Sequence, residues 1–153
     1  MVEHMLDIAW QQRVLALKHR TTEAEDREYV ALVDQAKWRC TLEVARVLVQ
    51  TFTAEEDYEA QETVVSTLLT ADPRIYDTAI LERLPELHAT CPAWARTLVS
   101  GALNTDPDLL TTLADSLGTP IRETLLQVLN ERPMLNVWQD TALSAIARLE
   151  QTA

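Results

Sequence analysis

Only two glycines, Gly101 and Gly118, occur among the 153 residues of this chain. Glycine supplies the backbone conformations that phosphate-binding loops, dinucleotide-binding turns and the tight turns of β-sandwiches and barrels require. Two glycines are too few for any of these structures. The sequence therefore excludes many nucleotide-binding enzymes and favours a fold of helices, which other residues can start and stop.

Prolines mark several helix starts. Proline lacks an N–H group, so it fits the first turn of a helix, where that group would have no partner, and it breaks helix interiors. Asp72, Asp106 and Thr119 directly precede three prolines, and their side chains can accept the free N–H groups of a helix start. The prolines that begin amphipathic runs are Pro73, Pro92, Pro107 and Pro120.

Two capping boxes add further starts. Thr22 with Glu25, and Thr53 with Glu56, each place a threonine three residues before a glutamate, so that the two residues can cap one another's backbone donors. These pairs predict helices that begin near residues 23 and 54.

Apolar residues recur at helical spacing along the whole chain, which predicts nine helices and no strand. The run at 46–52 is rich in β-branched residues, as a strand would be, but its apolar residues also fit one helical face, and we favour the helix. At 153 residues we expect one domain, 1–153, of about nine antiparallel helices. The predicted helices are 4–19, 23–38, 41–52, 54–70, 73–89, 92–104, 107–117, 120–131 and 137–150.

A short internal repeat bears on how these helices are arranged. The segments LLTADPRIY at 68–76 and ALNTDPDLL at 102–110 align with a 34-residue offset. This period is typical of stacked helix hairpins and favours a HEAT-like or irregular α-solenoid. The alternative is that aspartate-proline simply starts helices wherever it occurs.

The net charge indicates the class of partner. The chain has 24 acidic and 13 basic residues, a formal net charge of −11. This charge would repel a nucleic-acid backbone and an anionic membrane surface. We therefore expect a basic protein as the partner, with no direct nucleic-acid or membrane binding; the oligomeric state stays open.

Compartment and chemistry follow from a few residue types. Cys40 and Cys91 lie 51 positions apart, which fits a reducing compartment better than a disulfide framework, and no long uncharged apolar run occurs. We expect a cytoplasmic protein. The three histidines lack metal-ligand spacing and the serines lack a glycine elbow, so we expect no metal, no cofactor, no catalytic residue and no enzyme.

An acid-rich segment is the strongest candidate binding surface. No basic residue occurs between Arg46 and Arg74. On the predicted helix 54–70 an inward stripe of Ala54, Tyr58, Val65 and Leu68 would leave Glu55, Glu59 and Glu62 on one outward face. That face is either solvated without a partner or a docking face for a cationic protein. The predicted partner-binding residues are Glu55, Glu56, Asp57, Tyr58, Glu59 and Glu62.

Two further predictions concern other positions. We expect the tryptophans to pack in the core or at helix junctions, rather than to form a ligand cage. They are Trp10, Trp38, Trp94 and Trp138. If the acid-rich segment is merely solvated, the next candidate surface is the 105–120 turn, with Asp106, Asp108 and Asp115.

The segment 42–130 resembles a family of bacterial immunity proteins called immunity protein 30, found with polymorphic and contact-dependent growth inhibition toxins. The carrying sequence is LPELHATCPAWARTLVSGALN at 84–104. The family looks all-helical: a tyrosine-bearing helix ends in leucine-proline, a Pro-x-Trp helix start follows, and a further helix closes on leucine-asparagine. The matching positions are Tyr76, Leu84, Pro85, Pro92, Trp94, Leu103 and Asn104.

The resemblance implies a cognate immunity protein that binds and neutralises the C-terminal domain of a toxin, one with a basic, nuclease-type surface. It also implies that the Pro-x-Trp and Leu-Asn residues shape a helix pair and do not define the partner. Without it, two other classes remain: a HEAT-like adaptor or scaffold that binds another basic protein, and a small helical enzyme.

Overall fold

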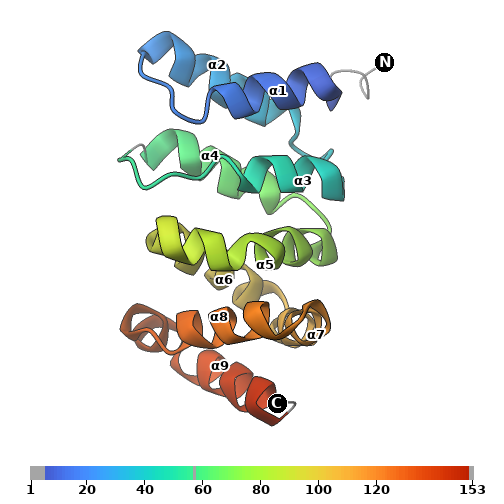
Figure 1. Cartoon of the computed structure of the whole chain (residues 1–153), viewed down its shortest axis with the longest axis vertical. Helices are drawn as coiled ribbons and strands as arrows, with labels where there is room; N and C mark the ends of the chain where they lie inside the picture. Colours follow the sequence, from blue (N-terminus) through green and yellow to red (C-terminus); the bar gives the residue numbers. More distant parts are fainter. Residues whose placement is uncertain (1–5, 57, 152–153) are drawn as a thin grey trace. The chain divides into compact units, whose positions relative to one another are not determined.

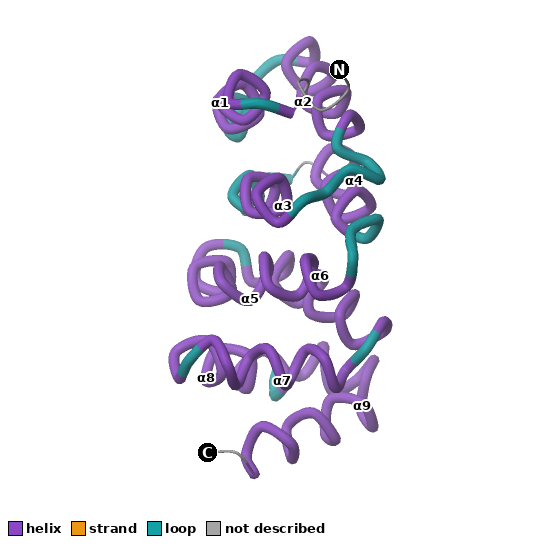
Figure 2. Tube along the Cα trace, turned by 90° about the vertical axis from the view of Figure 1, so that its right-hand side faces the viewer, coloured by secondary structure: helices purple, strands orange, loops and turns teal. Residues whose placement is uncertain are grey.

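The computed structural model describes residues 6–56 and 58–151, and all regular structure in them is α-helical (Figure 1). Figure 2 shows helices joined by short loops, with no strand in this part of the chain. The all-α prediction is confirmed, and the run at 46–52 lies mostly in a helix. The helices are α1 Ile8–Ala16, α2 Glu23–Gln35, α3 Leu42–Val49, α4 Tyr58–Leu68, α5 Pro73–Thr90, α6 Pro92–Thr105, α7 Pro107–Leu117, α8 Thr119–Leu129 and α9 Arg132–Gln151.

Most predicted helix starts are confirmed by the caps that were expected. The hydroxyl of Thr22 accepts the backbone N–H of Glu25 at 3.1 Å, and the carboxylate of Glu25 accepts the N–H of Thr22 at 3.2 Å. Asp72 accepts the N–H of Arg74, and Asp106 accepts the N–H of Leu109. These starts were predictable because each depends on residues two or three positions apart.

The predicted capping box of Thr53 and Glu56 is wrong, since α4 begins only at Tyr58. The reason is a buried side chain further along the helix. Gln61 accepts the backbone N–H of Thr53 at 2.7 Å and donates to the carbonyl oxygen of Glu55 at 3.2 Å. These bonds satisfy backbone groups that a longer helix would have paired, so the segment before α4 stays non-helical.

Several other boundaries differ from the predictions. Helix α1 begins at Ile8 and not at residue 4, and α1, α2 and α3 each end three residues early, at Ala16, Gln35 and Val49. Helix α8 begins at Thr119, but the residue before it, Gly118, occupies the N-cap without any side-chain cap, so the capping role of Thr119 is wrong. Gly118 has φ 115°, a conformation that suits glycine and ends α7. Helix α9 begins five residues before the predicted 137, because Pro133 fits its first turn. Its geometry is interrupted at Trp138, with φ −118° and ψ 29°.

The described helices group into two compact units, Met1–Tyr76 and Asp77–Ala153. The prediction of one domain stays a prediction. In the first unit α1 and α2 form one hairpin and α3 and α4 another, with α1 packed on α3 and α2 on α4 (Figure 2). This is the packing expected between stacked helix hairpins. Its largest fully buried side chains include Leu17, Tyr29, Leu48 and Leu68.

In the second unit, α7, α8 and α9 pack on one another, and α6 contacts all three. Only Gly118 separates α7 from α8, and these two helices are in contact. The interior is aliphatic, which fits the small aromatic content of the chain. Fully buried side chains here include Leu98, Leu110, Leu125, Leu129 and Met134.

The tryptophans do not share one environment. Trp10 is buried, and its indole N–H donates to the carbonyl oxygen of Leu32 at 2.9 Å. Trp94 and Trp138 are half-buried, whereas 77% of Trp38 is exposed. The core prediction is thus confirmed for Trp10 and wrong for Trp38, which lies in the turn between α2 and α3.

Candidate partner-binding groove

The predicted outward face of Glu55, Glu59 and Glu62 is not one helical face. Because α4 begins at Tyr58, Glu55 lies in the bend before it, where its carboxylate is 3.6 Å from the ring of His19. Glu59 and Glu62 do lie on α4, and both are exposed, as is Glu56 in the bend. Asp57 and the side chain of Tyr58 are outside the described residues.

The inward stripe of α4 is also displaced from its predicted register. Ala54 is exposed and precedes the helix, and Val65 is only half-buried, whereas Leu68 is buried as predicted. Ala60 and Val64 are the buried residues above Leu68. This register places Glu59 beside the packed face of α4 and next to helix α2.

A groove of about 570 Å³ runs between α2 and α4. Four carboxylates and one guanidinium line it, together with small apolar side chains. Most of these residues come from α2, at the i, i+3, i+4, i+7 spacing of one helical face. We call this surface the α2–α4 groove; its residues are Glu23, Asp26, Arg27, Val30, Ala31, Asp34, Glu59 and Ala60.

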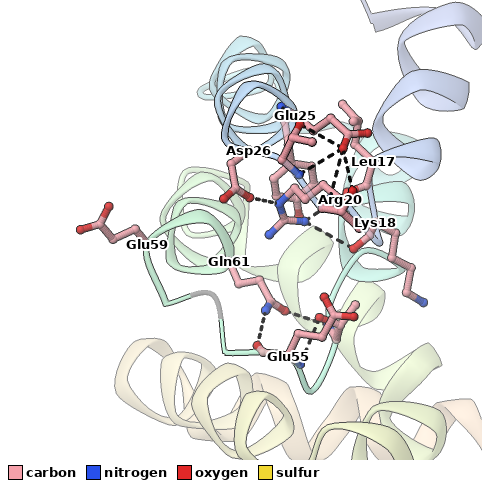
Figure 3. Close-up of polar contacts among 12 residues, drawn as sticks. Leu17, Lys18, Arg20, Glu25, Asp26, Glu55, Glu59 and Gln61 are labelled. Carbon is pink, nitrogen blue, oxygen red and sulfur yellow. Dashed lines mark hydrogen bonds and ion pairs between the residues drawn. The ribbon is translucent and has the colours of Figure 1, made fainter.

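Two of the groove carboxylates have cationic neighbours. Glu23 lies 3.8 Å from the guanidinium of Arg27, one helical turn away, and Asp26 accepts a hydrogen bond from Arg20. The side chains of Asp34 and Glu59 make no ion pair or hydrogen bond within residues 6–56 and 58–151. Figure 3 shows the Glu59 carboxylate pointing away from the Arg20–Asp26 pair. The groove therefore keeps uncompensated negative charge on both of its walls.

Arg20 forms the base of the α2 wall. Its side chain is only 4% exposed, and it donates to the carbonyl oxygen of Leu17 at the end of α1 (Figure 3). The guanidinium lies 4.0 Å above the ring of Tyr29, and the Tyr29 hydroxyl pairs with that of Thr51 at 2.6 Å. Burial raises the pKa of Tyr29 above its ordinary value. These contacts fix α1, α2 and the end of α3 around one buried cation.

We expect Asp26→Asn to destabilise the protein by about 2 kcal/mol, because it replaces a charged hydrogen-bond acceptor of the buried Arg20 guanidinium with a neutral amide. This loss is smaller than that of a fully buried pair, roughly 3 to 5 kcal/mol, since the Asp26 side chain is 50% exposed. Urea unfolding measures the change.

The control for this prediction is Arg20→Met, which removes the buried charge itself and keeps an alkyl chain above Tyr29. Replacing a buried ion with an apolar side chain of similar length costs less than keeping the ion and removing a charged partner from it. The Arg20→Met variant should therefore be more stable than Asp26→Asn. A loss for Arg20→Met that equals or exceeds that of Asp26→Asn would contradict the prediction.

The second candidate surface, at 105–120, has its acids already engaged. Asp106 caps α7, Asp108 pairs with Arg148 of α9, and Asp115 lies 3.9 Å from Arg122 of α8. These carboxylates serve the packing of α7 against its neighbours. They leave less free charge for a partner than Asp34 and Glu59 do.

The described residues offer little for chemistry. No three of their histidine, cysteine, aspartate and glutamate side chains are grouped so as to hold a metal ion. His88 lies 3.0 Å from the carboxylate of Glu131, which also pairs with Arg96 at 3.0 Å, and so ties α5 and α6 to the α8–α9 turn. None of the helices that the structure describes, α1 to α9, is long and apolar enough to span a membrane.

No family model, curated protein or solved structure matches this chain. The resemblance to immunity protein 30 therefore stays a hypothesis that rests on residues 84–104. In the structure these residues cover the end of α5, with Pro85 inside it, and nearly all of α6, which begins at Pro92. The Pro-x-Trp motif does start a helix, as the resemblance implies, but the implied helix end at Leu84 and Pro85 is wrong, since α5 continues to Thr90.

The sequence indicates Glu59 as a surface acid, but it does not show that α2 forms the other wall of the groove. The α2 residues that line this wall lie 25 to 36 positions before Glu59 in the chain. Only the packing of α2 on α4 brings them beside Glu59. A signal was present, since Glu23, Asp26 and Asp34 fall on one helical face with Arg27 and Val30, but nothing local in the sequence shows which helix that face approaches.

Proposed function

We propose that this chain is a cognate immunity protein that binds the basic C-terminal domain of a bacterial toxin through the α2–α4 groove. The observation that carries the proposal is the pair of uncompensated carboxylates, Asp34 and Glu59, on opposite walls of one groove. Val30 and Ala60 also line the groove and give an apolar surface for the stems of lysine or arginine side chains. Such a groove suits a cationic protein surface.

Neutralisation in this proposal needs no reaction. A nuclease toxin binds phosphate through lysine and arginine side chains, so its functional surface is basic. Carboxylates that pair with those side chains compete with the nucleic acid for the same surface. The net charge of −11 increases the rate of encounter with such a surface over longer distances.

Growth rescue tests the proposed function. The proposal requires a toxin gene next to the gene of this chain. The toxin domain from that position is expressed in cells together with wild-type protein, which should restore growth. The double variant Asp34→Lys/Glu59→Lys should restore growth much less. A matched control, Glu123→Lys/Glu150→Lys, makes the same change in net charge at exposed acids of α8 and α9, neither of which lines the groove, and should rescue like the wild type.

Failure of the wild-type chain to rescue would contradict the immunity function. If the chain then still bound a basic protein of its own cell through Asp34 and Glu59, the HEAT-like adaptor would be the better description. Rescue that is equal for the groove variant and its control would place the toxin on another surface.

A further inference from the structure

Trp38 combines unusual exposure with an unusual backbone conformation. Its side chain is 77% exposed, and its φ of 65° is the only positive φ of a non-glycine residue among those described. It follows the last turn of α2, where a left-handed residue commonly ends a helix and glycine is the usual choice. A tryptophan there gains little from burial and bears steric strain. Some other role should favour it.

The conformation of Trp38 is held by its neighbours. Its backbone N–H donates to the hydroxyl of Thr70 at 2.9 Å, and that hydroxyl donates to the carbonyl oxygen of Thr67 at 2.6 Å. Beside this chain of bonds, the thiol of Cys40 lies 3.6 Å from the carbonyl oxygen of Ala36 and 3.7 Å from that of Thr67. These bonds fix the α2–α3 turn on the end of α4. The indole therefore projects from a backbone of defined conformation.

Trp38 lines a second groove of the first unit, about 730 Å³ in volume. Leu42 and Ile75 provide half-buried apolar walls. Its exposed rim carries both signs of charge, with Arg39 directly after Trp38 and the carboxylates of Glu43 and Asp72 across from the turn. The site thus presents a projecting aromatic side chain and a cavity on the same surface.

We propose that this surface, the Trp38 groove, binds the same surface of a second copy of the chain across a two-fold axis. In such an isologous contact both copies use the same surface, so that surface must be complementary to itself. The Trp38 of each copy enters the other copy's groove, and the Arg39 of each copy faces the other copy's Glu43. A uniformly basic or acidic partner would meet a like charge on this mixed rim.

The proposal does not rest on the proposed function. The α2–α4 groove and the Trp38 groove share no lining residue. Binding of a toxin domain and self-association can therefore be measured separately, and either can fail without the other.

Sedimentation velocity over a wide range of protein concentrations tests the inference. The wild type should pass from monomer to a species of twice the monomer mass. Trp38→Gly should raise the dissociation constant at least about tenfold, because tryptophan anchors dominate interfaces. Its melting temperature, measured where the protein is monomeric, should not fall, since glycine relieves the left-handed strain. The control Val137→Ala, at a valine that is 73% exposed, should dimerise like the wild type.

A charge exchange tests the two-fold arrangement. Arg39→Glu should weaken the dimer, and Arg39→Glu combined with Glu43→Arg should restore it, because the pairs across the axis form again with their signs reversed. A wild type that stays monomeric at every concentration would overturn the proposal, as would a Trp38→Gly variant that dimerises as tightly as the wild type. A double variant no tighter than Arg39→Glu would overturn the paired arrangement.

Discussion

Asp77→Asn should stabilise the protein markedly at pH 8 and change its stability little at pH 4. Asp77 lies on α5 and is only 2% exposed. Burial, and to a smaller extent the nearby negative charge of Asp106, raise the pKa of its carboxyl group to about 7. The native state therefore holds a proton on Asp77 at pH values where an unfolded chain has already released it.

The sign of the pH dependence follows from that raised pKa. An unfolded aspartate titrates near pH 3.9. Between about pH 4 and 7 the native state binds the extra proton, so its stability falls as the pH rises through this window. A shift of about 3 pKa units corresponds to roughly 4 kcal/mol. Because asparagine is neutral at every pH, Asp77→Asn abolishes this loss of stability with rising pH.

Thermal or urea unfolding between pH 4 and 8 measures the effect. The wild type should lose stability toward pH 8, and Asp77→Asn should show a much flatter profile. Asp140→Asn, at an exposed aspartate of α9, is the matched control and should follow the wild type. Identical pH profiles for Asp77→Asn and the wild type would show that Asp77 titrates normally in the folded protein.

The sequence predicted those parts of the fold that depend on near neighbours. The α2, α5 and α7 starts were correct because Thr22, Asp72 and Asp106 cap backbone groups only two or three residues away. The start of α4 was missed because Gln61 binds the backbone of Thr53 eight positions earlier. The side-chain amide of Gln61 satisfies backbone groups that a further turn of helix would have paired. The apolar periodicity of the sequence does not reveal such a substitution.

The candidate site was predicted only in part for a similar reason. Glu59 was recognised from its charge and spacing, but a groove has two walls, and the α2 wall depends on which helix packs on α4. The exposure of Trp38 was equally hidden, since tryptophan is usually buried by its large apolar surface. Its position is set by the hydroxyl of Thr70, which lies 32 residues away in the chain.

Reversing the free groove charges should slow binding of the toxin domain by about 100-fold at low ionic strength, within the range that electrostatic steering supplies. The variant is Asp34→Lys/Glu59→Lys, which changes both walls of the groove. Of the predicted outward face it changes only Glu59, because Glu55 lies outside α4 beside His19 and Glu62 does not line the groove. Folding stability should change little, since Asp34 and Glu59 are both exposed.

The central claim is tested most directly by the association rate as a function of ionic strength, measured with the purified toxin domain that the wild type neutralises in the rescue experiment. The wild-type rate should be high at low salt and fall steeply as salt is added. The rate of Asp34→Lys/Glu59→Lys should be low and nearly independent of salt, whereas Glu123→Lys/Glu150→Lys, with the same net charge, should stay much closer to the wild type. Equal low-salt rates for these two variants would contradict the α2–α4 groove as the docking surface.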